Sequence, residues 1–577
     1  MDESTASWHE RHPDRWGREL AELDATGWDY RVTRSRWGIG LLVHVPLPAE
    51  PLPIRVRVLF HETYPWFPPT VLDADKRLTA SRHRNPASGE LCLVHAEDWH
   101  ADTTVAGLLS VQLPRLLQAD ATQDNTGVAG LEYPVPSTVY HAQTLQRATV
   151  IVTDIDVPPG VEQGALTARF NVDGSLLGSG VLEAVLGEGV DARCDLPPHV
   201  LAQFAGPIAG RWIRDPGYRH DETPAAIWKR ITPRLRPLAL VNEGTRGSWV
   251  DNSQAELIGL LVPDAVDSCS SGESWAFLLR IRSGRGRAAR WKSIALRTQY
   301  YSRRVLAERT PVASALTDAS VFVVGLGALG LPLVQDLAQS GVGKLTVLDR
   351  DHVDVGTGTR QYGVLDAAGF AKAEVARNIV VGIAPYCDIT AFCGSLEAVW
   401  DRAKDEHVRR SHQEIRRELV EADLVIDATG NLAATRVLDR LRRAYARPFL
   451  HVSATAGGWG GVIALLERET GCWACVELAR NARQLPIPAA DPDGWVNPTR
   501  CAAPTFTGAR HQMQQISLHA AAVAIAHLTG EPMQLPYHAA SLRDRDGKPA
   551  PVRWREAVVP VADACPMHRR NALTQVS

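Results

Sequence analysis

The feature that most constrains this chain is a glycine-rich turn between two apolar runs. The first run leads into Gly325, Gly327 and Gly330 at G-x-G-x-x-G spacing, and the second run ends in Asp349. Apolar β-branched runs on either side of an amphipathic stretch predict strand, tight turn, helix and strand. Such a unit binds nucleotides, because glycines let the backbone approach a phosphate and the helix N-terminus presents N–H groups. The acid after the second strand commonly binds a ribose hydroxyl.

Length and charge narrow the class of protein. A chain of 577 residues is too long for one core and predicts two to four domains. A formal net charge of −3 gives no electrostatic footprint for nucleic acid. No apolar run reaches the ~20 residues of a membrane helix, and the first thirty residues are polar, so we expect a cytoplasmic chain without membrane contact. Nine cysteines, an odd number, favour metal or catalytic roles over disulfides.

Residues 1–130 are predicted to form a small sheet packed on helices. Residues 8–23 and 104–117 show helical patterns, whereas residues 37–45 and 54–60 read as strands. A proline-rich loop follows at 64–71, in which the prolines prevent a regular helix.

Five ordered landmarks in this region resemble the ubiquitin-conjugating fold. They are the Y-P-x-x-P-P loop that begins at Tyr64, the H-x-N tripeptide that ends at Asn85, a G-x-x-C sequence that ends at Cys92, then Trp99 and a helix. The resemblance implies that Cys92 accepts a protein C-terminus as a thioester and that Asn85 stabilises the oxyanion. The alternative is that Cys92 is a buried small apolar residue.

Residues 131–300 are predicted to hold a linker and a mixed α/β connecting domain. Turn-rich sequence up to about residue 137 precedes strand-like runs at 148–157, 166–172 and 275–282, with helical pieces near Val200 and Ala225. No motif in this region indicates a function.

The region after the glycine turn carries more charge than a dehydrogenase site requires. Asp351, Arg360 and Lys372 follow the second strand in quick succession, and a triphosphate with a pyrophosphate leaving group needs such cations. The order resembles the ThiF/MoeB and ubiquitin-activating superfamily, which implies adenylation of a protein's C-terminal carboxylate. By this resemblance Asp349 and Asp351 belong to the ATP site, and Arg360 and Lys372 hold the phosphates.

Two further positions are assigned by the same resemblance. Arg303 is similar to an arginine that reaches across a homodimer to the partner's ATP. The strand at 424–427 ends in Asp427, and family members carry a magnesium-binding aspartate three residues later, where this chain has Gly430. Asp427 is the nearest substitute as a ligand for Mg²⁺.

Two short-spaced pairs of ligand residues predict a structural zinc site. Cys472 and Cys475 form one pair, and Cys565 and His568 form the other. A Cys₃His set suits tetrahedral Zn²⁺ and leaves no position open for chemistry. Four unrelated buried side chains are the alternative.

Cys501 stands alone before a helix-like stretch at 512–528. It resembles the catalytic cysteine of autophagy-type activating enzymes. A position near a helix start, beside Arg500, lowers the pKa of a thiol. By this resemblance Cys501 attacks the acyl-adenylate, and the alternative is a cysteine of the core.

Taken together, the predicted fold is multidomain α/β: a ubiquitin-conjugating-like α+β domain (1–130), the connecting domain (131–300) and a Rossmann-like ThiF/MoeB adenylation domain (301–577). This order resembles the bacterial fusion enzymes of type II CBASS antiphage islands. It implies ATP, Mg²⁺ and structural Zn²⁺, a homodimer, and a protein substrate with a free C-terminus, either a cGAS/DncV-like nucleotidyltransferase or a ubiquitin-like modifier. An acyl group would pass from Cys501 to Cys92 and then to a lysine.

Three alternatives stay open at this point. A sulfur-carrier adenylyltransferase would use the ATP site without Cys92. An NAD-linked oxidoreductase would bind nicotinamide cofactor at the glycine turn. A non-catalytic scaffold would bind the carrier protein without forming a thioester.

Overall fold

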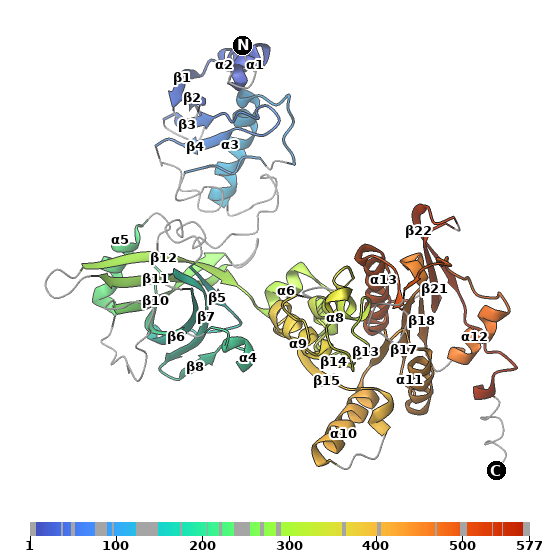
Figure 1. Ribbon diagram of the computed structural model, residues 1–577. Helices are drawn as coiled ribbons and strands as arrows, with labels where there is room; N and C mark the ends of the chain where they lie inside the picture. The colour runs from blue at the N-terminus through green and yellow to red at the C-terminus, as the bar shows by residue number, and fades with distance from the viewer. Residues whose placement is uncertain are drawn as a thin grey trace. The chain divides into compact units, whose positions relative to one another are not determined.

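A computed structural model describes most of the chain as two compact units, the first from residues 1–195 and 201–302 and the second from residues 196–200 and 303–577 (Figure 1). The described residues are 7–35, 38–47, 52–75, 89–94, 97–122, 148–173, 176–204, 206–218, 222–235, 254–265, 271–283, 290–360, 365–400, 405–467, 470–496, 505–532, 535–544 and 546–568. The predictions for Asn85 and Cys501 therefore lie outside the described residues. Among the described helices, none is long and apolar enough to cross a membrane.

The N-terminal part of the first unit is a four-stranded antiparallel sheet with helices. Its elements are α1 (Trp8–Arg11), α2 (Pro13–Thr26), β1 (Asp29–Ser35), β2 (Gly38–Val45), β3 (Ile54–Leu59), β4 (Thr70–Asp73) and α3 (Val105–Thr122), with the strands in chain order. The single helix predicted at 8–23 is two helices, because a residue before proline disfavours helical backbone and His12 adopts φ −128° and ψ 63°.

One buried carboxylate ties this small domain together. Glu19, on α2, is 0% exposed and accepts hydrogen bonds from Arg15, from the hydroxyl of Tyr64 and from the backbone N–H of Val105. The indole of Trp99 donates to the carbonyl of Pro65 at 2.7 Å. Two landmarks of the sequence, the proline loop and the tryptophan, are thus in direct contact.

The second part of the first unit is mostly β-structure rather than mixed α/β. Its strands are β5 (Thr149–Val152), β6 (Gln163–Asp173), β7 (Leu176–Gly187), β8 (Val190–Arg193), β9 (Gly206–Arg214), β10 (Gln254–Ala265), β11 (Ser271–Ser283) and β12 (Arg290–Tyr300), with the short helix α5 (Pro224–Ile231). The short helix α4 (Pro198–Leu201) follows β8 in the chain, and residues 196–200 are grouped with the second unit. The order is β5-β12-β11-β10-β9-β6-β7-β8, and β5 also pairs with β7, which closes the sheet on itself. Glycines in β7 and β9 and charges in β12 break the apolar alternation, so the sequence indicated only part of these strands.

The second unit is built on an eight-stranded sheet in the order β15-β14-β13-β16-β17-β18-β21-β22. These strands are β13 (Ser320–Val324), β14 (Lys344–Asp349), β15 (Asp388–Cys393), β16 (Leu424–Asp427), β17 (Phe449–Ala454), β18 (Gly460–Leu466), β21 (Tyr537–Arg543) and β22 (Pro549–Ala557). The first five in this order are parallel and the last three add antiparallel pairings. A separate pair joins β19 (Trp495–Val496) to β20 (Thr505–Phe506).

Helices cover both faces of this sheet (Figure 1). After α6 (Arg303–Arg309) and α7 (Ala313–Leu316), one face packs on α8 (Gly330–Gln339), α9 (Lys372–Ile383) and α13 (Arg510–Thr529). The other face packs on α10 (Glu406–Glu421), α11 (Leu432–Tyr445) and α12 (Trp473–Asn481). The predicted strand, turn, helix and strand are confirmed as β13, the glycine turn, α8 and β14.

Candidate functional site

The glycine turn lies where the strand order of the sheet reverses. β13 has β14 on one side and β16 on the other, and in parallel α/β sheets ligands bind at the carboxyl edge of such a switch point. Gly325 has φ +91°, and a Cβ there would lie 2.7 Å from the backbone of Thr429. A Cβ on Gly330 would lie 1.9 Å from the carbonyl of Gly325. These two glycines are required by packing.

Gly327 differs from the other two glycines. A Cβ at this position would meet no atom within 4 Å. The turn is therefore tightly packed at Gly325 and Gly330 and open at Gly327. An open backbone at Gly327 suits the approach of a phosphate.

Asp349 connects the glycine turn to the end of β14. Its side chain is 9% exposed. One carboxylate oxygen accepts from the N–H of Leu326 at 2.6 Å, and the other accepts from the N–H of Asp351 at 2.8 Å. Each carboxylate oxygen has more than one acceptor direction, so a ribose hydroxyl can still be bound here.

Lys372 reaches the same group of residues from the start of α9. Its ammonium lies 3.0 Å from the carboxylate of Asp351, and its backbone N–H donates to the carbonyl of Asp351. The Lys372 side chain is 13% exposed, whereas that of Asp351 is 56% exposed. Hydrogen bonds and an ion pair thus run without a break from the glycine turn through Asp349 and Asp351 to Lys372.

Arg360 is held by the segment that leads into α13. Its guanidinium donates to the backbone carbonyl of Phe506 and lies 5.4 Å from the centre of that ring. Next to it, the N–H of Arg510 donates to the carbonyl of Thr359 at 3.2 Å. Burial lowers the pKa of Arg360, yet a guanidinium stays charged at any physiological pH.

Asp427 lies at the end of β16 and is 0% exposed. One carboxylate oxygen accepts from the N–H and the hydroxyl of Thr429, at 3.0 and 2.6 Å. The other accepts from the hydroxyl of Thr435 at 2.6 Å and lies 3.0 Å from Nδ1 of His451, whose Nε2 lies 2.9 Å from the hydroxyl of Ser453. Both oxygens are therefore engaged by the protein.

This network fixes the charge of Asp427. Burial alone would raise the pKa of the carboxyl, but the hydrogen bonds from His451, Thr429 and Thr435 outweigh burial, and the pKa lies below its ordinary value. A carboxylate with a lowered folded-state pKa stabilises the fold fully above its unfolded pKa of about 3.9, and that stabilisation is lost as the pH falls through the folded pKa. A Mg²⁺ ion would have to displace these donors, so the geometry favours a structural role for Asp427.

We expect His451→Ala to lower the stability of the second unit. The change removes a donor from a carboxylate that stays buried, at a cost of about 2–3 kcal/mol, which is a fall of roughly 4–12 °C in the unfolding temperature of a domain of this size. Scanning calorimetry measures this fall in the unfolding temperature. The matched control is His527→Ala, because His527 pairs with the half-exposed Glu467 at 3.2 Å and a surface pair contributes about 1 kcal/mol or less. Equal shifts for the two variants would contradict the structural role.

Arg303 lies away from these residues. It begins α6, and its guanidinium is 4.6 Å from the ring of Tyr386. Tyr386 precedes β15, at the amino end of that strand, whereas the glycine turn follows the carboxyl end of β13. The structure therefore does not bring Arg303 to the glycine turn of its own chain, and its predicted role across a homodimer stays a prediction.

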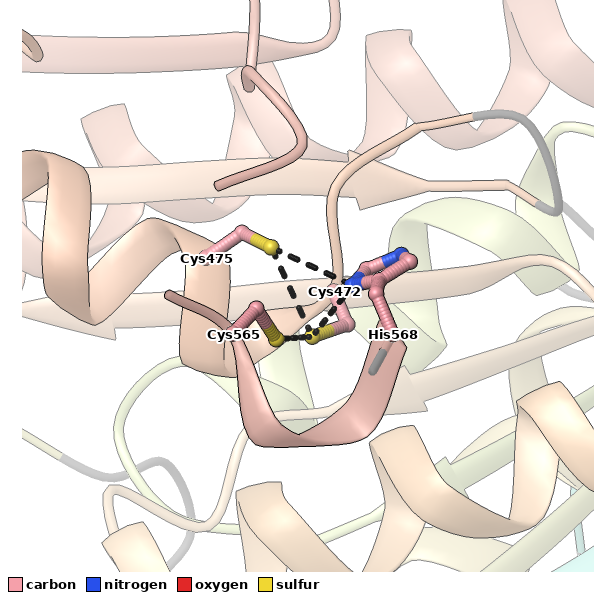
Figure 2. A group of neighbouring side chains, drawn as sticks. All are labelled: Cys472, Cys475, Cys565 and His568. Carbon is pink, nitrogen blue, oxygen red and sulfur yellow. Dashed lines mark hydrogen bonds between the residues drawn. The ribbon is translucent and has the colours of Figure 1, made fainter. Parts of the chain in front are cut away.

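The four predicted zinc ligands come together (Figure 2). One ligand atom from each of Cys472, Cys475, Cys565 and His568 lies within 4.8 Å of the others. The three cysteines are fully buried, and Nδ1 of His568 lies 3.5 Å from Sγ of Cys475. Three thiols and one imidazole on this scale fit a tetrahedral Zn²⁺.

The metal cluster and the Asp427 network share a neighbour. Trp473 lies between the cysteines of the first pair and is 4% exposed. Its ring centre is 4.1 Å from that of His451. Side chains at the two sites are thus in packing contact, although the sequence placed them in unrelated motifs.

Cys92 faces a groove instead of the core. Leu91 and Leu93 are 5% and 3% exposed and belong to the apolar cluster of the small domain. Cys92, between them, is half-buried and lines a cavity of about 600 Å³ together with residues that include His61, Phe67 and Glu90. The alternative that Cys92 is a buried apolar residue does not hold.

Two residues that contact predicted site residues, His451 beside Asp427 and Phe506 beside Arg360, were not predicted from the sequence. His451 sits within an apolar strand, and a histidine in such a run signals a buried polar partner. Phe506 had no signal in the sequence, because its contact with Arg360 is made across a separation of 146 residues.

Comparison with known proteins agrees with this geometry. Residues 301–541 match the family described as the ThiF family. The chain is 26% identical over 584 residues to protein y4oA of Sinorhizobium fredii, which is described as uncharacterized, and the alignment covers 97% of each chain.

Two relatives from Escherichia coli match parts of the chain. The sulfur carrier protein ThiS adenylyltransferase is 27% identical over 277 residues, which is 46% of this chain and 93% of that protein. The molybdopterin-synthase adenylyltransferase is 34% identical over 165 residues, which is 28% of this chain and 60% of that protein. Residues 301–541 are therefore a ThiF-family domain.

Proposed function

We propose that the ThiF-family domain adenylates the C-terminal carboxylate of a protein substrate, and that the acyl group then passes to Cys501, to Cys92 and to a lysine amine. The observation that carries the proposal is the unbroken run of contacts from the glycine turn through Asp349 and Asp351 to Lys372. These contacts support the proposal, because they hold a carboxylate suited to a ribose hydroxyl, and a lysine suited to phosphate charge, next to the glycine turn.

The proposed reaction has four steps, which are adenylation, capture by one thiol, transfer to the second thiol and attack by an amine. A carboxylate oxygen of the substrate attacks the α-phosphorus of ATP, and pyrophosphate leaves with the bonding pair. Lys372 and Arg360 are suited to offset the charge that develops on the phosphates. A thiolate then attacks the acyl carbon and AMP leaves, the second thiolate repeats the exchange, and the attack of an amine on the thioester yields an amide and a free thiol.

Magnesium would neutralise phosphate charge at this edge when it is bound with ATP. A Cβ at Gly430 would meet no atom within 4 Å, so the position of the missing carboxylate has space. The side chain of Asp351 is 56% exposed. It is better suited to bind Mg²⁺ than Asp427, whose two carboxylate oxygens already accept hydrogen bonds from the protein.

The groove at Cys92 supports the conjugating steps. A thioester needs a cysteine that a protein C-terminus can reach, and Cys92 lines an open cavity with the exposed ring of Phe67 at its side. The similarity to y4oA extends over all three parts of the chain, which supports a function that uses the N-terminal domain together with the ThiF-family domain. A role in antiphage defence, with a cGAS-like nucleotidyltransferase or a ubiquitin-like modifier as substrate, belongs to this proposal.

Adenylation without conjugation is the second candidate. It is favoured by the two Escherichia coli relatives, whose descriptions are those of adenylyltransferases. Loss of Cys92 would then leave every product unchanged.

The adenylation step is tested with Lys372→Ala. We expect the exchange of radiolabelled pyrophosphate into ATP, measured with a candidate carrier protein, to fall by about 100-fold or more, because removing one group that stabilises developing charge has this effect. Lys548→Ala is the control, since Lys548 is exposed on the turn between β21 and β22. Exchange that persists in the Lys372 variant, or that ignores the carrier, would count against adenylation at this site.

A further inference from the structure

The contact between Arg360 and Phe506 joins two parts of the site that are distant in sequence. Arg360 follows the short 3₁₀ turn η4 (Val355–Thr357), and Phe506 ends β20. The guanidinium donates to the Phe506 carbonyl and lies over the ring. The bond from the N–H of Arg510 to the carbonyl of Thr359 makes a second tie between the same segments.

Phe506 is itself held in place by β19. Phe506 pairs with Trp495 in the β19–β20 register, and their ring centres are 6.3 Å apart at an interplanar angle of 83°. Arg360, Phe506 and Trp495 therefore form a continuous row of side chains, in which the two rings meet edge to face. Trp495, at its outer end, is 57% exposed.

We propose that Phe506 positions Arg360 for the nucleotide phosphates, and that this row of side chains transmits nucleotide binding to the β19–β20 pair. This rests on the proposed function, since it takes Arg360 as a phosphate ligand. A guanidinium in a fixed plane loses less rotamer entropy when it binds a phosphate. A change in its position must also move the ring and the carbonyl that it contacts.

The row of side chains ends at the strands next to Cys501 in the sequence, which the acyl group would reach after adenylation. Cys501 lies between Val496 and Thr505 in the sequence, so β19 and β20, which flank it, are the strands that a shift of Phe506 and Trp495 would move. Nucleotide occupancy at the phosphates would thus be communicated to the chain on both sides of this cysteine. Phe506 acts through Arg360 and is a positioning residue, not a catalytic one.

The test combines ATP binding with amide hydrogen exchange on the full chain. We expect Phe506→Ala to weaken the binding of MgATP, measured by calorimetry, by about fivefold to 30-fold, the range that corresponds to one partly desolvated cation–π contact. In the wild type, saturating MgATP is expected to change the exchange of peptides that cover 495–496 and 505–510. In the Phe506 variant this change is expected to be lost at saturating MgATP.

Two variants separate positioning from a loss of structure. Phe506→Tyr keeps a ring under the guanidinium and is expected to restore both the affinity and the exchange response. Tyr445→Ala removes an exposed aromatic ring at the far end of α11 and is expected to change neither. If Phe506→Ala binds MgATP with wild-type affinity, or if saturating MgATP does not change amide exchange in the wild type, the inference is overturned while adenylation stands. If the wild type does not bind MgATP, both the inference and the proposed function are overturned.

Discussion

Replacement of Cys501 by alanine is expected to abolish both thioester adducts of the protein, whereas Cys92→Ala should retain the adduct at residue 501 and lose the one at residue 92. This asymmetry follows from the order of the proposed relay. Thiol exchange is nearly isoenergetic, so only the adenylation step drives the acyl group forward, and in the proposed relay Cys92 receives the acyl group from Cys501. Fusion on one chain raises the effective concentration of one thiol near the other to about millimolar.

The measurement is gel separation of reductant-sensitive adducts after incubation with ATP, magnesium and a candidate carrier. Candidate carriers are small proteins with a free C-terminus, such as a ubiquitin-like protein or a cGAS-like nucleotidyltransferase. Cys194→Ala is the matched control, because Cys194 is a half-buried thiol of the β-rich domain without any assigned role. An adduct that survives unchanged in both the Cys92 and the Cys501 variants would lie on neither cysteine and would rule out the relay. An adduct at residue 92 in Cys501→Ala, with none at residue 501 in Cys92→Ala, would reverse its order.

The βαβ unit could be predicted from the sequence because each of its signals is local. The spacing of Gly325, Gly327 and Gly330 is set by one turn, and the close approaches of Gly325 and Gly330 to backbone show why a side chain is not tolerated there. The sequence also placed Asp351 and Lys372 in one site, because both charged residues follow β14 in quick succession, and the structure shows them paired. The predicted zinc ligands converge, because short-spaced ligand pairs carry strong geometric information.

The parts that could not be predicted depend on contacts across the fold. The sequence made Asp427 a candidate magnesium ligand, yet its carboxylate is taken up by partners from α11 and β17, which no local pattern reveals. From the sequence, Cys92 could be either a reactive thiol or a buried apolar residue. In the fold, Leu91 and Leu93 point into the core, and Cys92 between them lines the groove. Arg303 reads as a member of the ATP site, but in its own chain it lies beside Tyr386.

The Cys₃His cluster leads to the second prediction of large effect. We expect Cys565→Ser to reduce bound zinc from one ion per chain to a small fraction of that, and to lower the stability of the ThiF-family domain by about 3 kcal/mol or more, since the free energy of structural zinc binding is folding free energy. The shift in unfolding temperature would be roughly 6–12 °C for a domain of this size. Elemental analysis and calorimetric scanning measure the two effects.

The location of the cluster explains why the loss should spread beyond the C-terminal segment. Within the described residues, Cys565 and His568 are the only ligands that such an ion would have in the chain after β22. Trp473, which lies between Cys472 and Cys475 in the sequence, packs on His451. Removal of the ion would therefore loosen α12 and the ring that supports the Asp427 network. Cys393→Ser is the control, because Cys393 is an exposed thiol of the same unit, and it should leave zinc content and unfolding unchanged. A Cys565 variant that retains a full equivalent of zinc would show that the ion is held elsewhere, and one that loses zinc without a shift in unfolding would show that the cluster does not stabilise the fold.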